Sequence, residues 1–299
     1  MTDGLPQLLA QHSGAVSRGD FLAARQAESR FVTNYSTTPI DVSELDDALQ
    51  AEYYRLRYNT SRDMGNLTAA HEAAMAWQAL VEQVAVEGAG QADTEEVPDD
   101  EKNSQLGQLW QARARLALDE ADRYVQFNSD EFPPDDSDIP LISRFSRHIP
   151  ELVDVVVAYP QDYSLIETLL IFERACTRVR RNDLSQTAAD VTRELNATTL
   201  QHAFDDWIVW CDAQWLRSQG KLKEAARLAA GRLEQDRCSD AFRIYFLRFL
   251  GEVSAAAGQN ETAHRMFERS SAAAEEQDLV LDQAIAAALI NELPVNESA

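Results

Sequence analysis

Glycine and proline are scarce in this chain, with 11 and 9 residues among 299. A large all-β protein needs more of both in its turns, so their scarcity argues against that class. The residues that dominate instead are alanine, leucine, glutamate, glutamine and arginine, which favour helices. We therefore predict an all-α protein, and its length allows one elongated domain or two compact ones.

Cysteine is also rare, because Cys176, Cys211 and Cys238 are the only three and form no CxxC pair. This is typical of reduced intracellular thiols rather than of a disulfide framework or a zinc site. The opening residues MTDGLPQLLA have no basic start, and no apolar run approaches the roughly 18 residues that cross a membrane. We expect a cytoplasmic protein without a membrane partner.

Basic residues are few compared with acidic ones, because the chain has 27 Lys and Arg against 50 Asp and Glu, and its net charge is −23. Arginine far outnumbers lysine, which favours a bacterial source. The acids concentrate in DTEEVPDDE (93–101) and DEFPPDDSD (130–138), two segments typical of solvated loops. We expect no binding to a nucleic-acid backbone, although such a chain could attract a basic protein.

A recurring pattern stands out: a glycine is followed five residues later by an alanine. It occurs at Gly19, Gly65, Gly220 and Gly258, and RNDLSQTAA places Asn182 in the glycine position and Thr187 in the alanine position. Glycine and asparagine tolerate the positive φ that ends a helix. Polar residues that follow could cap the next helix: Asp20, Asn66, Asp183 and Asn260. The intervals from Asn182 to Gly220 and from Gly220 to Gly258 are both 38 residues, which indicates a repeated hairpin.

This pattern resembles the tetratricopeptide-repeat (TPR) family, in which a helix ends in glycine before an Asp or Asn and a second helix begins. The last unit matches best, because Gly251 and Phe267 stand at the small and aromatic positions of the family. The resemblance covers 1–87 and 165–278, with a spacing longer than the family's 34 residues. It implies a right-handed α-solenoid of stacked antiparallel helix hairpins.

Helical periodicity and breakers place the hairpins along the chain. They are expected at 4–17/21–35, 42–63/67–87, 104–127/139–158, 162–180/184–196, 200–218/222–235 and 239–256/260–276, with a capping helix at 279–292. Residues 88–103 combine glycine, proline and acids, so we expect an acidic flexible linker or insertion there. The expected organisation is N-terminal hairpins over 1–87, this linker, and C-terminal hairpins with a capping helix over 104–299.

Catalytic patterns are weak. HEAAM (71–75) begins like the zinc motif HExxH, but Met75 replaces the second histidine. ETAH (261–264) is a single ExxH, whereas a di-iron bundle needs two and further carboxylates. The sequence has no glycine-rich phosphate loop, no GxSxG elbow and no Rossmann fingerprint. We expect no enzymatic activity, no metal and no cofactor, and a helical-bundle metalloenzyme is the least favoured alternative.

The TPR resemblance implies a groove lined by the first helix of each hairpin. The implied partner-binding residues are Glu52, Arg55, Asn59, Arg62, Trp207, Trp210, Gln214, Arg217, Tyr245, Arg248 and Glu252, with Arg180 beside the corresponding row of the fourth unit. Arginine binds carboxylates through two parallel hydrogen bonds. Arg55 with Asn59 resembles part of the carboxylate clamp of some TPR proteins. In the alternative interpretation, the arginines pair with acids of the chain itself and the tryptophans pack between hairpins.

The sequence therefore favours a non-catalytic adaptor or scaffold that binds a protein or peptide, through an acidic segment or a C-terminal carboxylate. The alternative from another class is an acidic nucleic-acid mimic that inhibits a basic protein, which predicts acids in rows along one face. A further hypothesis is that residues 93–101 occupy the groove until a partner displaces them.

Overall fold

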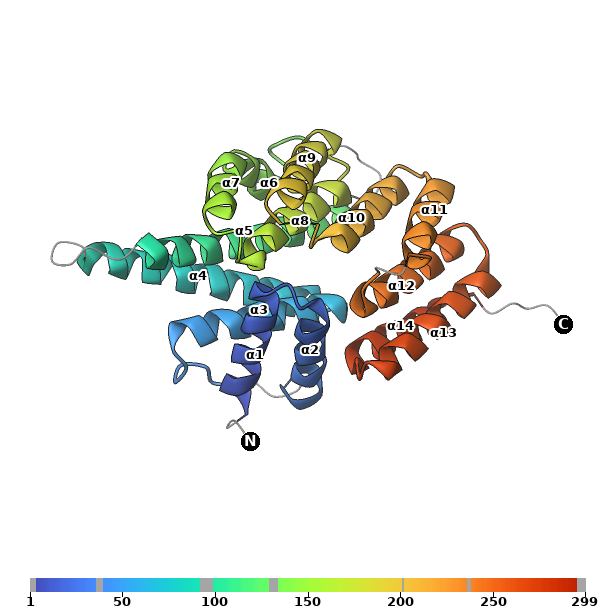
Figure 1. Ribbon diagram of the computed structural model, residues 1–299, viewed down its shortest axis with the longest axis horizontal. Helices are drawn as coiled ribbons and strands as arrows, with labels where there is room; N and C mark the ends of the chain where they lie inside the picture. Colours follow the sequence, from blue (N-terminus) through green and yellow to red (C-terminus); the bar gives the residue numbers. More distant parts are fainter. Residues whose placement is uncertain are drawn as a thin grey trace. The chain divides into compact units, whose positions relative to one another are not determined.

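The computed structural model describes residues 4–35, 40–91, 99–128, 134–200, 202–235 and 238–294, without the side chains of 85–91 and 99–105. These residues form fourteen α-helices and no strand, which confirms the all-α prediction. The helices are α1 (Leu5–Ser17), α2 (Phe21–Tyr35), α3 (Asp47–Asp63), α4 (Leu67–Gln91), α5 (Asp99–Phe127), α6 (Pro140–Ser146), α7 (Ile149–Ala158), α8 (Tyr163–Arg178), α9 (Asn182–Thr198), α10 (Asp205–Ser218), α11 (Leu222–Leu233), α12 (Asp240–Ala256), α13 (Asn260–Glu276) and α14 (Val280–Glu292) (Figure 1).

Most helices begin and end within a few residues of the expected positions. The exception is 139–158, expected as one helix, where α6 ends and α7 begins at Ile149. Pro150 lies in the first turn of α7, where its missing N–H costs no helical hydrogen bond. In the interior of a longer helix the same proline would remove one, so the chain starts a new helix instead.

Two compact units divide the chain, and their boundaries differ from the expected ones. Unit 1 comprises Met1–Asp20 and Thr38–Ala203, and unit 2 comprises Phe21–Thr37 and Phe204–Ala299. The expected first hairpin is therefore split, because α1 belongs to unit 1 and α2 to unit 2. The expected break between 1–87 and 104–299 does not separate units, since α4 and α5 pack together inside unit 1.

The expected linker over 88–103 is partly helical. Residues 88–91 end α4 and residues 99–103 begin α5. Residues 92–98 lie outside the described residues, and with them most of the segment 93–101 that was expected to occupy a groove.

The turns between helices confirm the expected use of glycine. Four turn glycines have φ between 71° and 76°: Gly19, Gly65, Gly220 and Gly258. At each turn the N–H after the glycine donates to a carbonyl five residues back, as Asn66 does to Ser61 O at 2.8 Å. This bond is the mark of a Schellman helix end. Asn66 also caps the next helix, because its side chain accepts from Ala69 N at 3.1 Å.

The fourth turn corrects the register of the repeat. Arg180, not Asn182, has the positive φ, at 57°, and Asn182 is already the first residue of α9. The small position then falls on Ser185, which is buried, rather than on Thr187, which is exposed. The interval from Arg180 to Gly220 is 40 residues, so the spacing of 38 holds only for the last two glycine turns. Asp183 and Asn260 likewise lie inside helices and are not caps.

Small residues allow the helices of each hairpin to approach closely. Ala70, Ala225 and Ala263, each five residues after a turn glycine, are at most 1% exposed. A Cβ atom on Gly251 of α12 would lie 2.4 Å from a ring carbon of Phe267 in α13. Glycine is therefore required at 251 for this packing, as the sequence pattern predicts.

Candidate functional site

The predicted partner-binding residues divide between the two units. Unit 1 holds Glu52, Arg55, Asn59, Arg62 and Arg180. Unit 2 holds Trp207, Trp210, Gln214, Arg217, Tyr245, Arg248 and Glu252.

Arg55 of α3 lies in a buried group of charges, which we name the Arg55 cluster. Its Nη2 donates to Glu167 of α8, and its Nη1 lies 3.8 Å from Glu52 Oε2. Arg115 of α5 lies 3.4 Å from the same Glu167 oxygen, and His12 of α1 contacts Glu52 through Nδ1. None of these five residues is more than 8% exposed.

The charges of the Arg55 cluster are balanced internally, with two guanidinium groups against two carboxylates. Burial raises the pKa of Glu52, but His12 and Arg55 outweigh burial and hold that pKa below its ordinary value. Burial lowers the pKa of Arg55, and the charges of Glu167 and Glu52 more than reverse that shift. Arg55 is thus committed to a carboxylate of its own chain. Contrary to the prediction, neither Glu52 nor Arg55 is available to a partner in this structure.

Asn59 and Arg62 also bond within unit 1. Asn59 Oδ1 accepts from Arg115 Nε at 3.3 Å, and Arg62 Nη2 lies 2.9 Å from Asp122 Oδ2. Arg180 is exposed, but it forms the turn before α9. In unit 1 the arginines Arg55 and Arg62 therefore pair with acids of the chain itself, as the alternative interpretation of the sequence expected.

The predicted aromatic residues of unit 2 pack between helices. The ring of Trp207 in α10 lies 5.8 Å from that of Phe242 in α12, and Phe21 of α2 lies edge-on at 5.3 Å from Trp207. The ring of Trp210 lies 6.4 Å from that of Tyr245. These side chains are half-buried, so they join the core of unit 2 at its edge.

The polar predicted residues of unit 2 pair with one another or with α14. Arg217 of α10 binds Glu252 of α12, and Arg248 Nη1 donates to Asp282 Oδ1 of α14 at 3.1 Å. Gln214 is half-buried on α10. Burial raises the pKa of Asp282, but Arg25 and Arg248 outweigh it and hold that pKa below its ordinary value.

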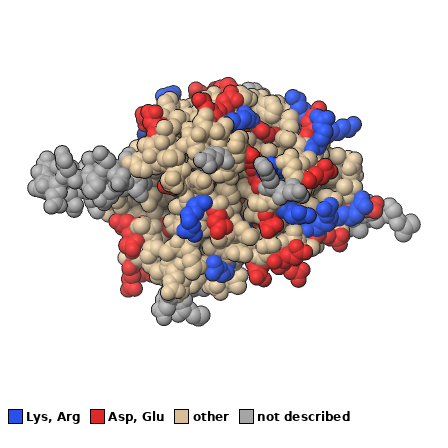
Figure 2. Space-filling model, in the orientation of Figure 1, with Lys and Arg blue, Asp and Glu red and all other residues tan. Residues whose placement is uncertain are grey.

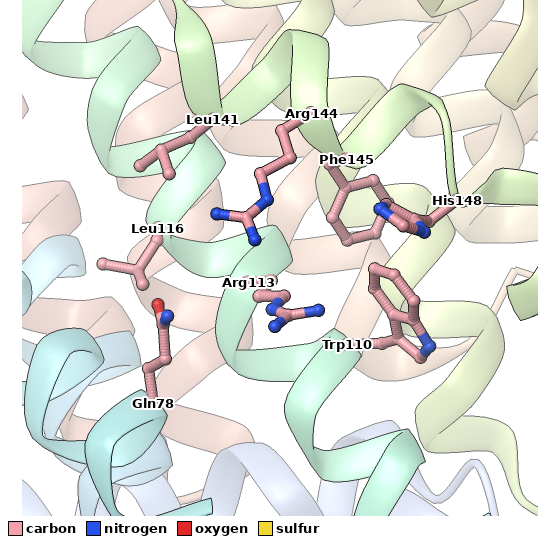
Figure 3. Close-up of a pocket in the computed structure, with 8 residues that line it drawn as sticks. All are labelled: Gln78, Trp110, Arg113, Leu116, Leu141, Arg144, Phe145 and His148. Atoms are coloured by element: carbon pink, nitrogen blue, oxygen red, sulfur yellow. The ribbon is translucent and has the colours of Figure 1, made fainter. Parts of the chain in front are cut away.

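A hollow that is open to solvent lies on unit 1 between α4, α5 and α6 (Figure 3). It is lined by Gln78 of α4, by Trp110, Arg113 and Leu116 of α5, by Leu141, Arg144 and Phe145 of α6, and by His148. In Figure 3 the guanidinium groups of Arg113 and Arg144 and the amide of Gln78 converge on the same space. The two leucines lie on one side of this space and the aromatic residues on the other.

The hollow is basic although the protein is acidic, because none of its eight lining residues is an acid. Arg144 is exposed and its side chain has no ion pair or hydrogen bond among the described residues. Arg113 lies 3.6 Å from a carboxylate oxygen of Glu82, beyond hydrogen-bond distance, and 5.3 Å from the Trp110 ring. His148 Nδ1 lies 3.1 Å from Glu151. Two guanidinium groups beside apolar walls suit a carboxylate that is attached to an apolar group.

The sequence analysis did not predict this hollow, although a signal for it exists. Spacing of i, i+3, i+4 and i+7 places four of the lining residues on one side of the chain: Leu141, Arg144, Phe145 and His148. Trp110 and Arg113 are spaced by three residues in the same way. The spacing identifies each face, but only the packing of α6 against α5 brings the two faces together.

The histidines of the two weak catalytic motifs have carboxylate neighbours. His71 Nδ1 lies 2.8 Å from Asp119, and His264 Nδ1 lies 3.4 Å from Glu268. In the described part of the chain no group of three or more His, Cys, Asp or Glu residues could hold a metal ion. All three cysteines are free thiols. Among the described helices, none combines the length and apolar character that a membrane crossing requires.

Comparison with known proteins gives no family model that matches the chain and no curated protein that matches it. The resemblance to TPR proteins therefore stays a prediction from the sequence pattern, and an interpretation of function has to start from the geometry.

Proposed function

We propose that this protein is a non-catalytic adaptor that binds an acidic segment or a C-terminal carboxylate of a partner protein in the hollow of unit 1. The observation that carries the proposal is the convergence of Arg113 and Arg144, without an acid among the lining residues, beside apolar walls. In a chain with a net charge of −23, a hollow that two guanidinium groups line repels an anionic group less than an acidic surface does.

The proposal includes the finer architecture expected from the sequence. We propose that α3 with α4, α10 with α11 and α12 with α13 are TPR-like hairpins that stack in a right-handed sense within their units, and the Schellman turns that join their helices support this. Helices α1 and α2 are not part of such a hairpin, because they belong to different units. We also propose a cytoplasmic location, which the three free thiols support because oxidising compartments favour disulfides.

The walls of the hollow favour a peptide over an inorganic anion. Leu116 and Phe145 are almost completely buried, whereas Leu141 is 38% exposed and Arg144 is exposed. An inorganic anion would use only the guanidinium groups. A carboxylate beside a leucine or phenylalanine side chain would use both the guanidinium groups and the exposed edge of the apolar wall.

An array of acidic hexapeptides tests this proposal directly. Each peptide carries one leucine or phenylalanine at its C-terminus and is made with a free carboxylate and as the amide. The array is bound to the unmodified protein, to Arg144→Gln and to Arg147→Gln. The last is a matched control, because Arg147 lies three residues further on and does not line the hollow.

We expect Arg144→Gln to weaken peptide binding on the order of tenfold, which corresponds to the loss of one charge-assisted hydrogen bond. Arg147→Gln should bind as the unmodified protein does. Equal binding by all three proteins, or no binding by any, would rule out this site. If Arg144→Gln weakens only the peptides with a free C-terminal carboxylate, and the amidated peptides bind weakly to all three proteins, the C-terminal carboxylate rather than acidic side chains is the recognised group.

The nucleic-acid mimic gains no support from the face that Figure 2 shows. On this face, acidic side chains lie in scattered groups instead of a continuous row, and lysine and arginine side chains lie on the same face.

A further inference from the structure

Two exposed carboxylates lie beside the hollow of unit 1, although neither lines it. Glu82 of α4 accepts a hydrogen bond from Gln78 Nε2 at 2.7 Å, and the same carboxylate oxygen lies 3.6 Å from Arg113 Nη2. Glu151 of α7 lies with its Oε2 atom 3.1 Å from His148 Nδ1. Because Gln78, Arg113 and His148 line the hollow, each carboxylate is one contact away from it.

The two carboxylates lie on different sides of the hollow. Figure 3 shows Gln78 and His148 on opposite sides of the space in which the two guanidinium groups converge. Glu82 contacts the first of these residues and Glu151 contacts the second. The hollow therefore combines positive charge at its centre with negative charge at two of its edges.

Glu82 is the edge carboxylate that the local structure explains least. The side chains of Glu82 and Glu151 are 48% and 64% exposed, so both are accessible to a ligand. Glu151 lies in the first turn of α7, where the helix dipole favours an acid. Glu82 lies in the interior of α4, where no effect of a helix end acts on it. We therefore base the inference on Glu82.

The net charge of −23 limits the kind of ligand that the hollow binds well. One carboxylate is held by the guanidinium groups, but every further carboxylate of the ligand meets the field of an acidic protein. Next to Glu82 this repulsion is direct, because like charges that face each other across an interface disfavour binding. A lysine or arginine of the ligand at the same place is attracted both by Glu82 and by the net charge.

We propose that the hollow recognises the C-terminal carboxylate of a basic tail, with a lysine or arginine close to that carboxylate bound by Glu82. This inference rests on the function proposed above and narrows its partner. A C-terminal carboxylate supplies the one negative charge on a segment that needs no acidic side chain. The cation on Glu82 also replaces Arg113 as the neighbour of that carboxylate, which leaves Arg113 and Arg144 to the carboxylate of the tail.

Three fluorescent hexapeptides test the inference by anisotropy. All end in leucine with a free carboxylate, and the two residues before it are lysine, glutamine or glutamate. They are added to the unmodified protein, to Glu82→Lys and to Glu72→Lys. The last is the matched control, because Glu72 is exposed on the same helix, does not line the hollow and gives the same change in net charge. It lies about 15 Å from position 82 along the helix axis.

We expect the unmodified protein to bind the lysine peptide about two- to fivefold more tightly than the glutamine peptide, as a half-exposed ion pair gives. The glutamate peptide should bind most weakly. Glu82→Lys should reverse this order. Glu72→Lys should keep it, because salt at about 0.15 M screens charges beyond roughly 8 Å. Glu82→Gln removes the charge without adding one and should abolish the difference between the lysine and glutamine peptides.

An unchanged order in Glu82→Lys and Glu82→Gln, or the same reversal in Glu72→Lys, would overturn the inference. Arg144→Gln separates this outcome from a failure of the proposed function, because it should weaken all three peptides. Weakening by Arg144→Gln without any effect of the Glu82 variants would keep the hollow as a binding site and overturn only the basic tail. Unchanged binding of all three peptides to Arg144→Gln would overturn both proposals.

Discussion

Replacing Arg55 by alanine is expected to destabilise unit 1 by about 3 kcal/mol. The change leaves Glu167 without the guanidinium group that binds it and removes a positive charge near Glu52. Removal of one partner from a buried ion pair usually costs about 3 to 5 kcal/mol, because the remaining charge stays in the interior. We expect the lower end, since Arg115 remains 3.4 Å from Glu167 and His12 remains in contact with Glu52.

Thermal unfolding followed by circular dichroism measures this loss. For a unit of this size about 1 kcal/mol shifts Tm by about 2 to 4 °C, so Arg55→Ala should lower it by roughly 6 to 12 °C. Arg57→Ala is the matched control, because Arg57 lies on the same helix and its Nη1 contacts Tyr53 Oη at 3.2 Å without an ion pair among the described residues. The control should lose less than about 1 kcal/mol. Equal Tm values for the two variants would refute the conclusion that the ion pairs of the Arg55 cluster stabilise unit 1.

Three further outcomes are expected. Gly251→Ala adds a methyl group against the facing helix and should cost about 1 to 3 kcal/mol relative to Gly231→Ala, where the added group meets open space; equal Tm values would contradict this. Burial raises the pKa of Cys238 to about 11, so about 0.1% is thiolate at pH 8. Because a more basic thiolate is also a stronger nucleophile, its reaction with an aromatic disulfide reagent should be slower than that of free cysteine by on the order of tenfold. A rate equal to that of free cysteine would show that burial does not control this thiol. The pKa values of Glu52 and Asp282 are lowered in the folded protein, so the unfolded chain binds more protons and stability should fall as the pH drops below their ordinary values of 4.5 and 3.8. A urea midpoint that is the same at pH 7 and pH 3.5 would contradict that sign.

The sequence by itself determined the local elements of this protein. A helix end needs a residue with positive φ, and two helices that pack closely need a small residue near the turn. Both needs are met by residues close together in sequence, so the helices around Gly65, Gly220 and Gly258 could be predicted. The register failed at Arg180, because a residue other than glycine can adopt positive φ when the surrounding turn bonds compensate for the strain. A pattern that looks for glycine or asparagine does not find such a turn.

Only the tertiary structure decided which side chains meet. Arg55 has dozens of acids to choose from along the sequence, and its partner Glu167 is 112 residues away. Periodicity gives the face on which a residue lies, but not the face that will pack against it. For the same reason, neither the hollow that Arg144 lines nor the packing of α2 in unit 2 could be predicted from the sequence. The sequence could therefore predict that arginines and aromatic residues would gather, whereas the packing of distant helices decided which of them bond within the chain and which are exposed.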